Sequence, residues 1–226
     1  MANSNLTEML FILDRSGSMS GLEADTVGGF NSMIAQWKDR NVPVIVNTML
    51  FDHEILFLHD RVSIENVQPM TKNEYWARGN TALYDAVGTG IKHLKKIHKY
   101  IRPEDVPGHV TVVITTDGYE NASTAYTAQM VHDLISEQKK QGWKFIFLGA
   151  DIDAETVAQT LDIDRDMAFS INKSAESARD SFICVGAVCT APGGFDRGAL
   201  RQQLKKHLRK SGAQKGVADA QLPKPE

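Results

Sequence analysis

A short apolar run that ends in a carboxylate constrains the fold of this chain most strongly. The run covers residues 9–13 and is followed by Asp14, Ser16 and Ser18, with Gly17 relaxing the backbone between the serines. A continuous apolar run of this length is typical of a strand that is buried on both faces. Asp14 is therefore expected where that strand ends, which is the edge at which α/β folds bind their ligands.

Three oxygen-bearing side chains at positions i, i+2 and i+4 can turn toward one point and hold a small hard cation. Carboxylate and hydroxyl oxygens, with no thiolate or imidazole beside them, favour Mg²⁺, Mn²⁺ or Ca²⁺ over zinc or copper. Ser, Gly and Asp also form ordinary turns and cap helices. The loop alone therefore leaves a plain turn open as an alternative to a metal site.

Two later segments supply matching oxygens. Thr81 precedes a helix predicted over residues 83–100, and a second apolar strand over residues 110–116 ends at Asp117. In this order the segments resemble the metal-ion-dependent adhesion site (MIDAS) of the von Willebrand factor A (vWA) domain family: Asp-x-Ser-x-Ser, then a lone Thr, then a lone Asp after the fourth strand. The resemblance covers roughly residues 6–190. The metal ligands that it implies are Asp14, Ser16, Ser18, Thr81 and Asp117.

The rest of the chain alternates strand and helix patterns, which predicts an α/β fold with helices on both faces of the sheet. We expect strands over residues 9–13, 42–51, 55–58, 110–116, 145–150 and 167–170. We expect helices over residues 22–40, 83–100, 123–141, 154–161 and 174–188. The resemblance implies a doubly wound, Rossmann-like, mostly parallel sheet with strand order 3-2-1-4-5-6, which brings Asp14 and Asp117 into one crevice.

The second and third predicted strands are separated only by residues 52–54. So short a connection requires a hairpin, which makes the third strand antiparallel at the edge of the sheet. His53 lies in this turn, and we interpret it as an exposed turn residue rather than a metal ligand.

Composition divides the chain of 226 residues into a vWA-like domain over residues 1–190 and a basic tail over residues 191–226. The first part holds 17 Lys and Arg against 25 Asp and Glu, a formal charge of −8, and the tail holds 8 against 3, a charge of +5. An acidic domain argues against nucleic-acid binding. We expect the tail to be flexible. A second interpretation is that the tail docks a partner or an anionic surface.

Sequence features also bear on location. There is no run of 18 or more apolar residues, and the first residues lack the pattern of a signal peptide. We therefore expect a cytoplasmic protein with no membrane contact. Cys184 and Cys189 lack the spacing and His partners of a zinc site, and are expected to be reduced core residues.

The resemblance implies that three hydroxyls bind the metal directly while Asp14 and Asp117 act through water or hydrogen bonds. A metal bound in this way keeps much of its attraction for another anion, so an Asp or Glu of a partner protein can complete its octahedron. This predicts metal-dependent protein binding, with no catalysis. A Mg²⁺-dependent phosphoryl hydrolase is the main alternative, but it would usually need a second Asp where Ser16 stands and a positioned Lys. The third interpretation is a domain that binds no metal and only scaffolds an assembly. The presence of all five expected ligand residues argues against it.

Overall fold

The structure is a computed structural model that describes residues 2–40 and 43–171. It also describes isolated helical positions near the C-terminus, namely Ser181, Phe182, Val185, Gly186, Gly198, Gln202 and Lys206. Both cysteines and most of residues 191–226 lie outside the described residues. The domain boundary at residue 190 and the role of the basic tail therefore stay predictions.

The strands form one six-stranded sheet in the order β3-β2-β1-β4-β5-β6, as predicted. They are β1 (Asn3–Asp14), β2 (Val44–Phe51), β3 (Ile55–Ser63), β4 (Pro107–Thr116), β5 (Lys144–Ala150) and β6 (Ala168–Ile171). Neighbouring strands run parallel except for β2 and β3, which pair antiparallel at the edge. The hairpin prediction is therefore confirmed, and β1 and β4 lie side by side in the middle of the sheet.

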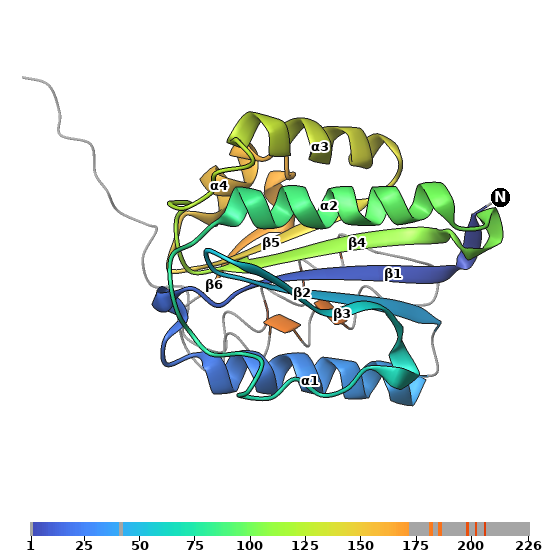
Figure 1. Ribbon diagram of the computed structural model, residues 1–226, viewed down its shortest axis with the longest axis horizontal. Coiled ribbons are helices and arrows are strands. Elements are labelled where there is room, and N and C mark those ends of the chain that lie inside the picture. The colour runs from blue at the N-terminus through green and yellow to red at the C-terminus, as the bar shows by residue number, and fades with distance from the viewer. Residues whose placement is uncertain are drawn as a thin grey trace, which may run out of the picture.

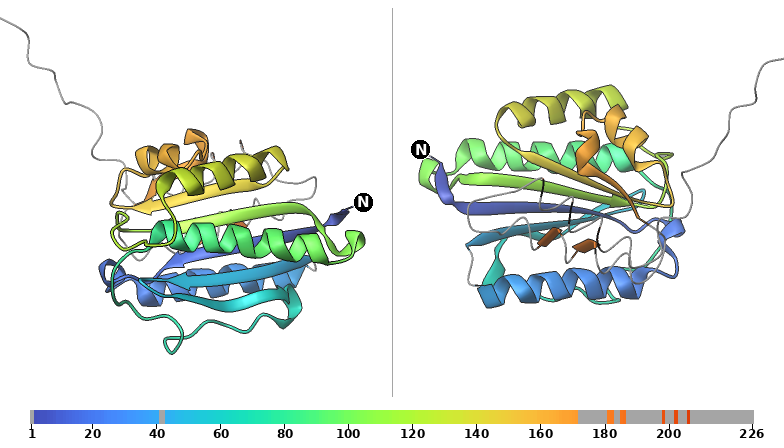
Figure 2. Two further views of the ribbon diagram at one scale, coloured as in Figure 1. Left: turned by 45° about the horizontal axis from the view of Figure 1, so that its top comes forward. Right: turned by 180° about the vertical axis from the view of Figure 1, so that it is seen from behind.

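Helices cover both faces of this sheet (Figure 1). Helix α1 (Glu23–Arg40) lies on one face, and α2 (Leu83–Tyr100) and α3 (Ala128–Lys140) lie on the other, with α4 (Ala154–Thr160) near α3 (Figure 2). Helix α2 buries four side chains at helical spacing, which are Leu83, Val87, Ile91 and Leu94. No helix in the described part of the chain combines the length and the apolarity needed to cross a membrane.

The central strand explains why the sheet is covered twice. Residues 9–13 of β1 are fully buried. Phe11 packs edge-on against Phe30 of α1, with ring centroids 5.5 Å apart. On the other face Gly90 of α2 lies over Leu10, and a Cβ added to this glycine would come within 3.1 Å of the Leu10 side chain. The apolar run is thus continuous because successive side chains face two different helices.

Positions near the C-terminus extend the core on the α1 face. Phe182 packs edge-on against Phe30 with centroids 6.3 Å apart. The indole nitrogen of Trp37 donates to the backbone oxygen of Gly186 at 2.8 Å. Phe182 and Val185 are both buried, and Cys189, which is expected in the core, lies outside the described residues.

Helix α3 begins later than predicted, at Ala128 instead of residue 123. The preceding backbone is held by carboxylates instead of by a helical turn. Glu120 accepts from the amides of residues 122 and 123, and Asp85 of α2 accepts from those of residues 124–126. Thr127 then caps the helix by accepting from the amide of Met130. Because Asp85 comes from a distant part of the sequence, the local pattern did not reveal this loop.

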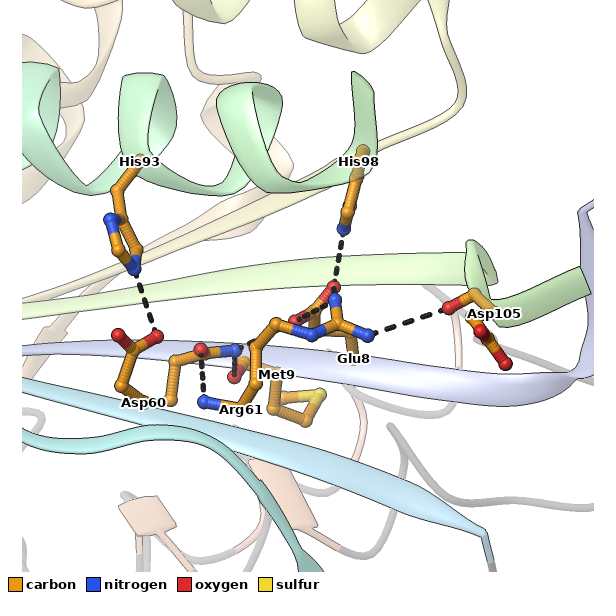
Figure 3. Close-up of polar contacts among 8 residues, drawn as sticks. Glu8, Met9, Asp60, Arg61, His93, His98 and Asp105 are labelled. Atoms are coloured by element: carbon orange, nitrogen blue, oxygen red, sulfur yellow. Dashed lines mark hydrogen bonds and ion pairs between the residues drawn. The ribbon is translucent and has the colours of Figure 1, made fainter. Parts of the chain in front are cut away.

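A buried polar cluster lies on β1 six residues before Asp14 (Figure 3). Glu8 is fully buried, and Nη1 of Arg61 donates to its two carboxylate oxygens at 2.9 and 3.0 Å. His98 of α2 contacts the same carboxylate at 2.5 Å, and Asn47 of β2 donates to it at 3.0 Å. The cluster therefore connects β1, β2, β3 and α2 through one carboxylate.

Candidate metal centre

The predicted ligands gather at the carboxyl ends of β1 and β4. Asp14 is the last residue of β1, and Asp117 follows the last residue of β4. Because these strands are parallel neighbours, both carboxylates lie at the same edge of the sheet. Asp14 is fully buried and Asp117 is 9% exposed. The strand order therefore brings the two carboxylates together, as predicted.

Asp14 is held by hydrogen bonds on both of its carboxylate oxygens. The amide of Ser16 donates to Oδ1 at 2.7 Å, and the hydroxyl of Thr116 donates to Oδ2 at 2.5 Å. Burial raises the pKa of Asp14 to about 6, because loss of water costs the carboxylate more than these hydrogen bonds return, and the charge of Asp117 adds to the effect. The carboxylate is consequently fixed in position but carries unfavourable charge when the site holds no cation.

The two serines are folded toward Asp117. A single 3-10 turn over Gly17–Met19 follows Ser16, and it leaves the Ser16 and Ser18 hydroxyl oxygens 3.0 Å apart. The Ser18 hydroxyl in turn donates to Oδ1 of Asp117 at 2.5 Å. Residues 99 positions apart in the chain are thus joined at one point.

Thr81 faces the same point from the loop before α2. A Cβ added to Gly118 would lie 2.9 Å from the Thr81 hydroxyl oxygen and 3.4 Å from that of Ser18. Both hydroxyls therefore border the space beside Gly118, and only glycine leaves that space open. Asn121 fixes Thr81 through two hydrogen bonds, accepting from its amide at 2.9 Å and donating to its carbonyl at 3.0 Å.

The loop that carries Thr81 is tied to the serine loop through its backbone. The amide of Gly17 donates to the carbonyl of Gly79 at 3.1 Å, and the amide of Arg78 donates to the carbonyl of Arg15 at 2.8 Å. The hydroxyl of Tyr75 donates to the carbonyl of Asp14 at 2.5 Å. A tyrosine hydroxyl is protonated at neutral pH, and burial raises the pKa of Tyr75 further, so the hydroxyl can donate. The relative positions of the hydroxyls are thus set by three contacts between the loops.

An ion-pair cluster flanks the centre on the β2 side. Asp52 is fully buried, and Oδ2 of its carboxylate lies 3.1 Å from Nε of Arg15 and 2.8 Å from Nε of Arg78. Arg78 also pairs with Glu54. Both guanidinium groups lie over the ring of Trp76, at 5.3 and 5.6 Å from its centroid.

Asp52, His53 and Glu54 also place three candidate ligand atoms within 4.8 Å of one another. The guanidinium groups already neutralise both carboxylates, and the side chain of His53 is 48% exposed. We therefore interpret this turn as part of the ion-pair cluster, and His53 as the exposed turn residue that the sequence predicted.

The oxygen positions at the centre suit a small hard cation. Octahedral ligands at about 2.0–2.1 Å from Mg²⁺ are separated from their neighbours by about 2.9 Å, close to the 3.0 Å between the Ser16 and Ser18 oxygens. The donor set is hydroxyl and carboxylate oxygen only, which also suits such an ion. The five residues present therefore fit the metal group that the motif implies.

The sequence patterns did not reveal the residues that hold the predicted ligands in place. Thr116, Tyr75 and Asn121 make direct hydrogen bonds to Asp14 or Thr81. A signal existed for Thr116, because a polar side chain next to a strand-end carboxylate can donate to a neighbouring strand. Tyr75 and Asn121 gave none, since their partners are distant in the sequence.

Comparison with known proteins yields structural likeness without close sequence relatives. No protein-family model matches the chain, and no curated protein matches it significantly by sequence. The vWF domain of the type V pili tip protein Mfa5 from Porphyromonas gingivalis is similar in structure, with TM-score 0.56 and 11% identity over 85% of this chain and 99% of that one. A D319A mutant of the PilB minor pilin from Streptococcus sanguinis gives TM-score 0.60 and 11% identity over 90% and 64%.

A third similar structure carries a metal. Proximal thread matrix protein 1 from the mussel byssus, with a zinc-occupied MIDAS motif, gives TM-score 0.54 and 15% identity over 82% of this chain and 48% of that one. The chain thus spans about half the length of the mussel protein. Together with the sheet order and the helices on both faces, these likenesses show that the chain has the fold of a vWA domain.

Proposed function

We propose that this domain binds a protein partner through a divalent metal. Mg²⁺ is the preferred ion, with Mn²⁺ or Ca²⁺ as alternatives, and the ligands are Ser16, Ser18 and Thr81 together with Asp14 and Asp117. A carboxylate from an Asp or Glu of the partner completes the coordination of the metal. The bound metal would supply an electrophilic site for that carboxylate, and the protein would hold the hydroxyls in position.

The observation that carries this proposal is the hydrogen bonding of Asp14. Both of its oxygens already accept from the protein, which favours a role through water or hydrogen bonds rather than direct ligation. The direct ligands would then be mainly neutral hydroxyls, and the metal would retain positive charge toward solvent. Ser18 is on the exposed side of the centre, where a partner can approach.

The same observation speaks against a phosphoryl hydrolase. An aspartate nucleophile needs an oxygen directed at the substrate, whereas Asp14 is fully buried with both oxygens in hydrogen bonds. The nearby guanidinium groups of Arg15 and Arg78 are bound to Asp52 and not directed at the centre. We therefore infer a binding domain and not an enzyme. We also propose that the protein acts in the cytoplasm.

The first prediction is that divalent metal stabilises the protein. At a tenfold excess over its dissociation constant, Mg²⁺ should add about 1.4 kcal/mol to the free energy of unfolding, or roughly 3–5 °C to the midpoint of thermal unfolding. The Thr81→Val variant should lose most of this shift, because it removes a hydroxyl ligand at nearly constant shape. Thr81→Ser is the matched control and should keep the shift. A wild-type midpoint that responds to neither Mg²⁺ nor Mn²⁺ would contradict the metal assignment.

A second prediction concerns the partner. Proteins captured from native extract by the immobilised domain in Mg²⁺ should be released by EDTA, because the bridging metal is removed. Changing the acidic residues of a captured protein to amides one at a time should identify one whose loss abolishes capture. Capture that EDTA leaves unchanged would contradict the mechanism, and phosphatase or nucleotidase turnover lost in Asp14→Asn would support the enzyme alternative.

A further inference from the structure

Exposed aromatic side chains lie on the loops that form the metal centre. The large hydrophobic side chains that are exposed in the described residues are Leu56, Trp76, Tyr100, Tyr119 and Met130. Trp76 is 43% exposed and stands in the loop that leads to Thr81, and Tyr119 is 60% exposed and stands two residues after Asp117. The other three lie on β3, α2 and α3.

The two aromatics flank the centre from opposite sides. The Trp76 ring is contacted by Arg15 and Arg78, whose guanidinium groups bind Asp52 at the end of β2. The hydroxyl of Tyr119 lies 3.5 Å from the backbone nitrogen of Asp153, in the loop after β5. Since β1 and β4 are the two strands between β2 and β5, the metal centre lies between Trp76 and Tyr119.

Both side chains suit protein recognition. Tyr and Trp are enriched among the residues that contribute most to binding energy at interfaces. The two cation–π contacts hold the Trp76 ring, which reduces the conformational entropy lost when a partner packs against it.

The distance between neighbouring strands determines which side chains of an extended partner segment can reach Trp76 and Tyr119. Neighbouring strands lie about 4.8 Å apart, so β2 and β5 each lie about 7 Å from the line midway between β1 and β4. In an extended chain, residues i−2 and i+2 lie about 6.6 Å from residue i and point to the same face. A segment that crosses the strand ends with residue i at the metal therefore brings its i−2 and i+2 side chains to the two aromatics.

We propose that the partner presents an extended segment with the pattern apolar-x-acidic-x-apolar. Its acidic residue binds the metal, and its two apolar side chains pack against Trp76 and Tyr119. This inference rests on the proposed function for the role of the acidic residue, and it adds the flanking residues and their register.

Synthetic peptides test the register. Each peptide has a central Glu in a Ser-rich background and carries Leu at positions ±1, at ±2, at ±4 or at none of these, and its binding to the full chain is measured in Mg²⁺ and in EDTA. The ±2 peptide should bind about tenfold more tightly than the peptide without Leu, and only in Mg²⁺. Equal binding of the ±1 and ±2 peptides, or tighter binding of the helical ±4 spacing, would overturn the extended register.

Variants test the contacts. Trp76→Ser and Tyr119→Ser should each weaken binding of the ±2 peptide about fivefold to tenfold. Both variants should keep the metal-induced rise in the unfolding midpoint. Tyr100→Ser is the matched control, because Tyr100 is 73% exposed at the far end of α2, and it should leave binding unchanged. If acidic peptides bind only with metal but neither variant weakens the ±2 peptide, this inference is wrong and the proposed function stands. If metal binds but no acidic peptide responds to it, the proposed function itself fails.

Discussion

Replacing Asp14 with asparagine is expected to stabilise the metal-free protein at pH 7 and to abolish its response to Mg²⁺. The pKa of Asp14 is raised from 3.8 to about 6 in the folded state, chiefly by burial. Between these pH values the folded state binds more protons than the unfolded state, so stability falls as the pH rises through this range and stays low above it. A shift of about two units corresponds to about 3 kcal/mol, which is the cost that the asparagine would remove.

Asparagine can replace the hydrogen bonds that Asp14 makes. Its amide oxygen can accept from the Ser16 amide, and its amide nitrogen can donate to the Thr116 hydroxyl oxygen. It cannot supply the negative charge that offsets the metal. The wild-type protein therefore tolerates a buried charge that reduces its stability without metal, which is a common cost at functional sites.

Urea unfolding in EDTA between pH 4 and pH 8 measures this effect. The wild-type and Asp14→Asn proteins should have similar free energies of unfolding near pH 4 and diverge up to pH 7, with the variant more stable. Mg²⁺ should then reduce the gap at pH 7 by stabilising the wild type alone. Asp133→Asn is the control, because the Asp133 side chain is 68% exposed. A variant less stable than the wild type in EDTA at pH 7 would contradict the account of Asp14.

The sequence predicted the fold well because buried strands and amphipathic helices leave local patterns. The apolar run over residues 9–13 predicts a strand covered on both faces, and the helix predicted over residues 83–100 has the bounds of α2. Strand ends were less accurate. β1 begins at Asn3 and β3 continues to Ser63, because their outer parts are partly exposed and carry polar residues that interrupt the apolar signal.

The sequence predicted which oxygen-bearing residues gather at the candidate site, but not the residues that surround them. The spacing of Asp14, Ser16 and Ser18 is a local feature, whereas the contact of Tyr75 with Asp14 joins residues 61 apart. The burial that raises the Asp14 pKa depends on how several loops pack over the strand end. Such packing is a property of the tertiary structure, so no short pattern in the sequence encodes it.

Replacing Arg61 with methionine is expected to cause a larger loss of stability than any surface change. Glu8 is fully buried, and Arg61 is the group that contacts both of its oxygens. The variant would leave a buried carboxylate with His98 and Asn47 as its remaining partners in this cluster. Removing one member of a buried ion pair typically costs about 3–5 kcal/mol, because the remaining charge has lost its compensation.

The double variant Glu8→Leu with Arg61→Met should recover much of this loss, because it leaves no unpaired carboxylate. Asn47 keeps its hydrogen bond to the Met9 carbonyl at 3.2 Å.

Lys95→Met is the matched control. Lys95 pairs with Glu137 on the surface, with side chains 31% and 54% exposed, and loss of this pair should cost less than about 1 kcal/mol. Urea unfolding of these proteins and of the Glu8→Leu single variant gives the comparison. If the losses of the two single variants simply add in the double variant, the buried pair is contradicted. Because Glu8 precedes Asp14 by six residues of extended strand, about 20 Å, Arg61→Met should still be stabilised by Mg²⁺. The fold and the metal centre would then respond separately to changes in the middle and at the carboxyl end of the same strand.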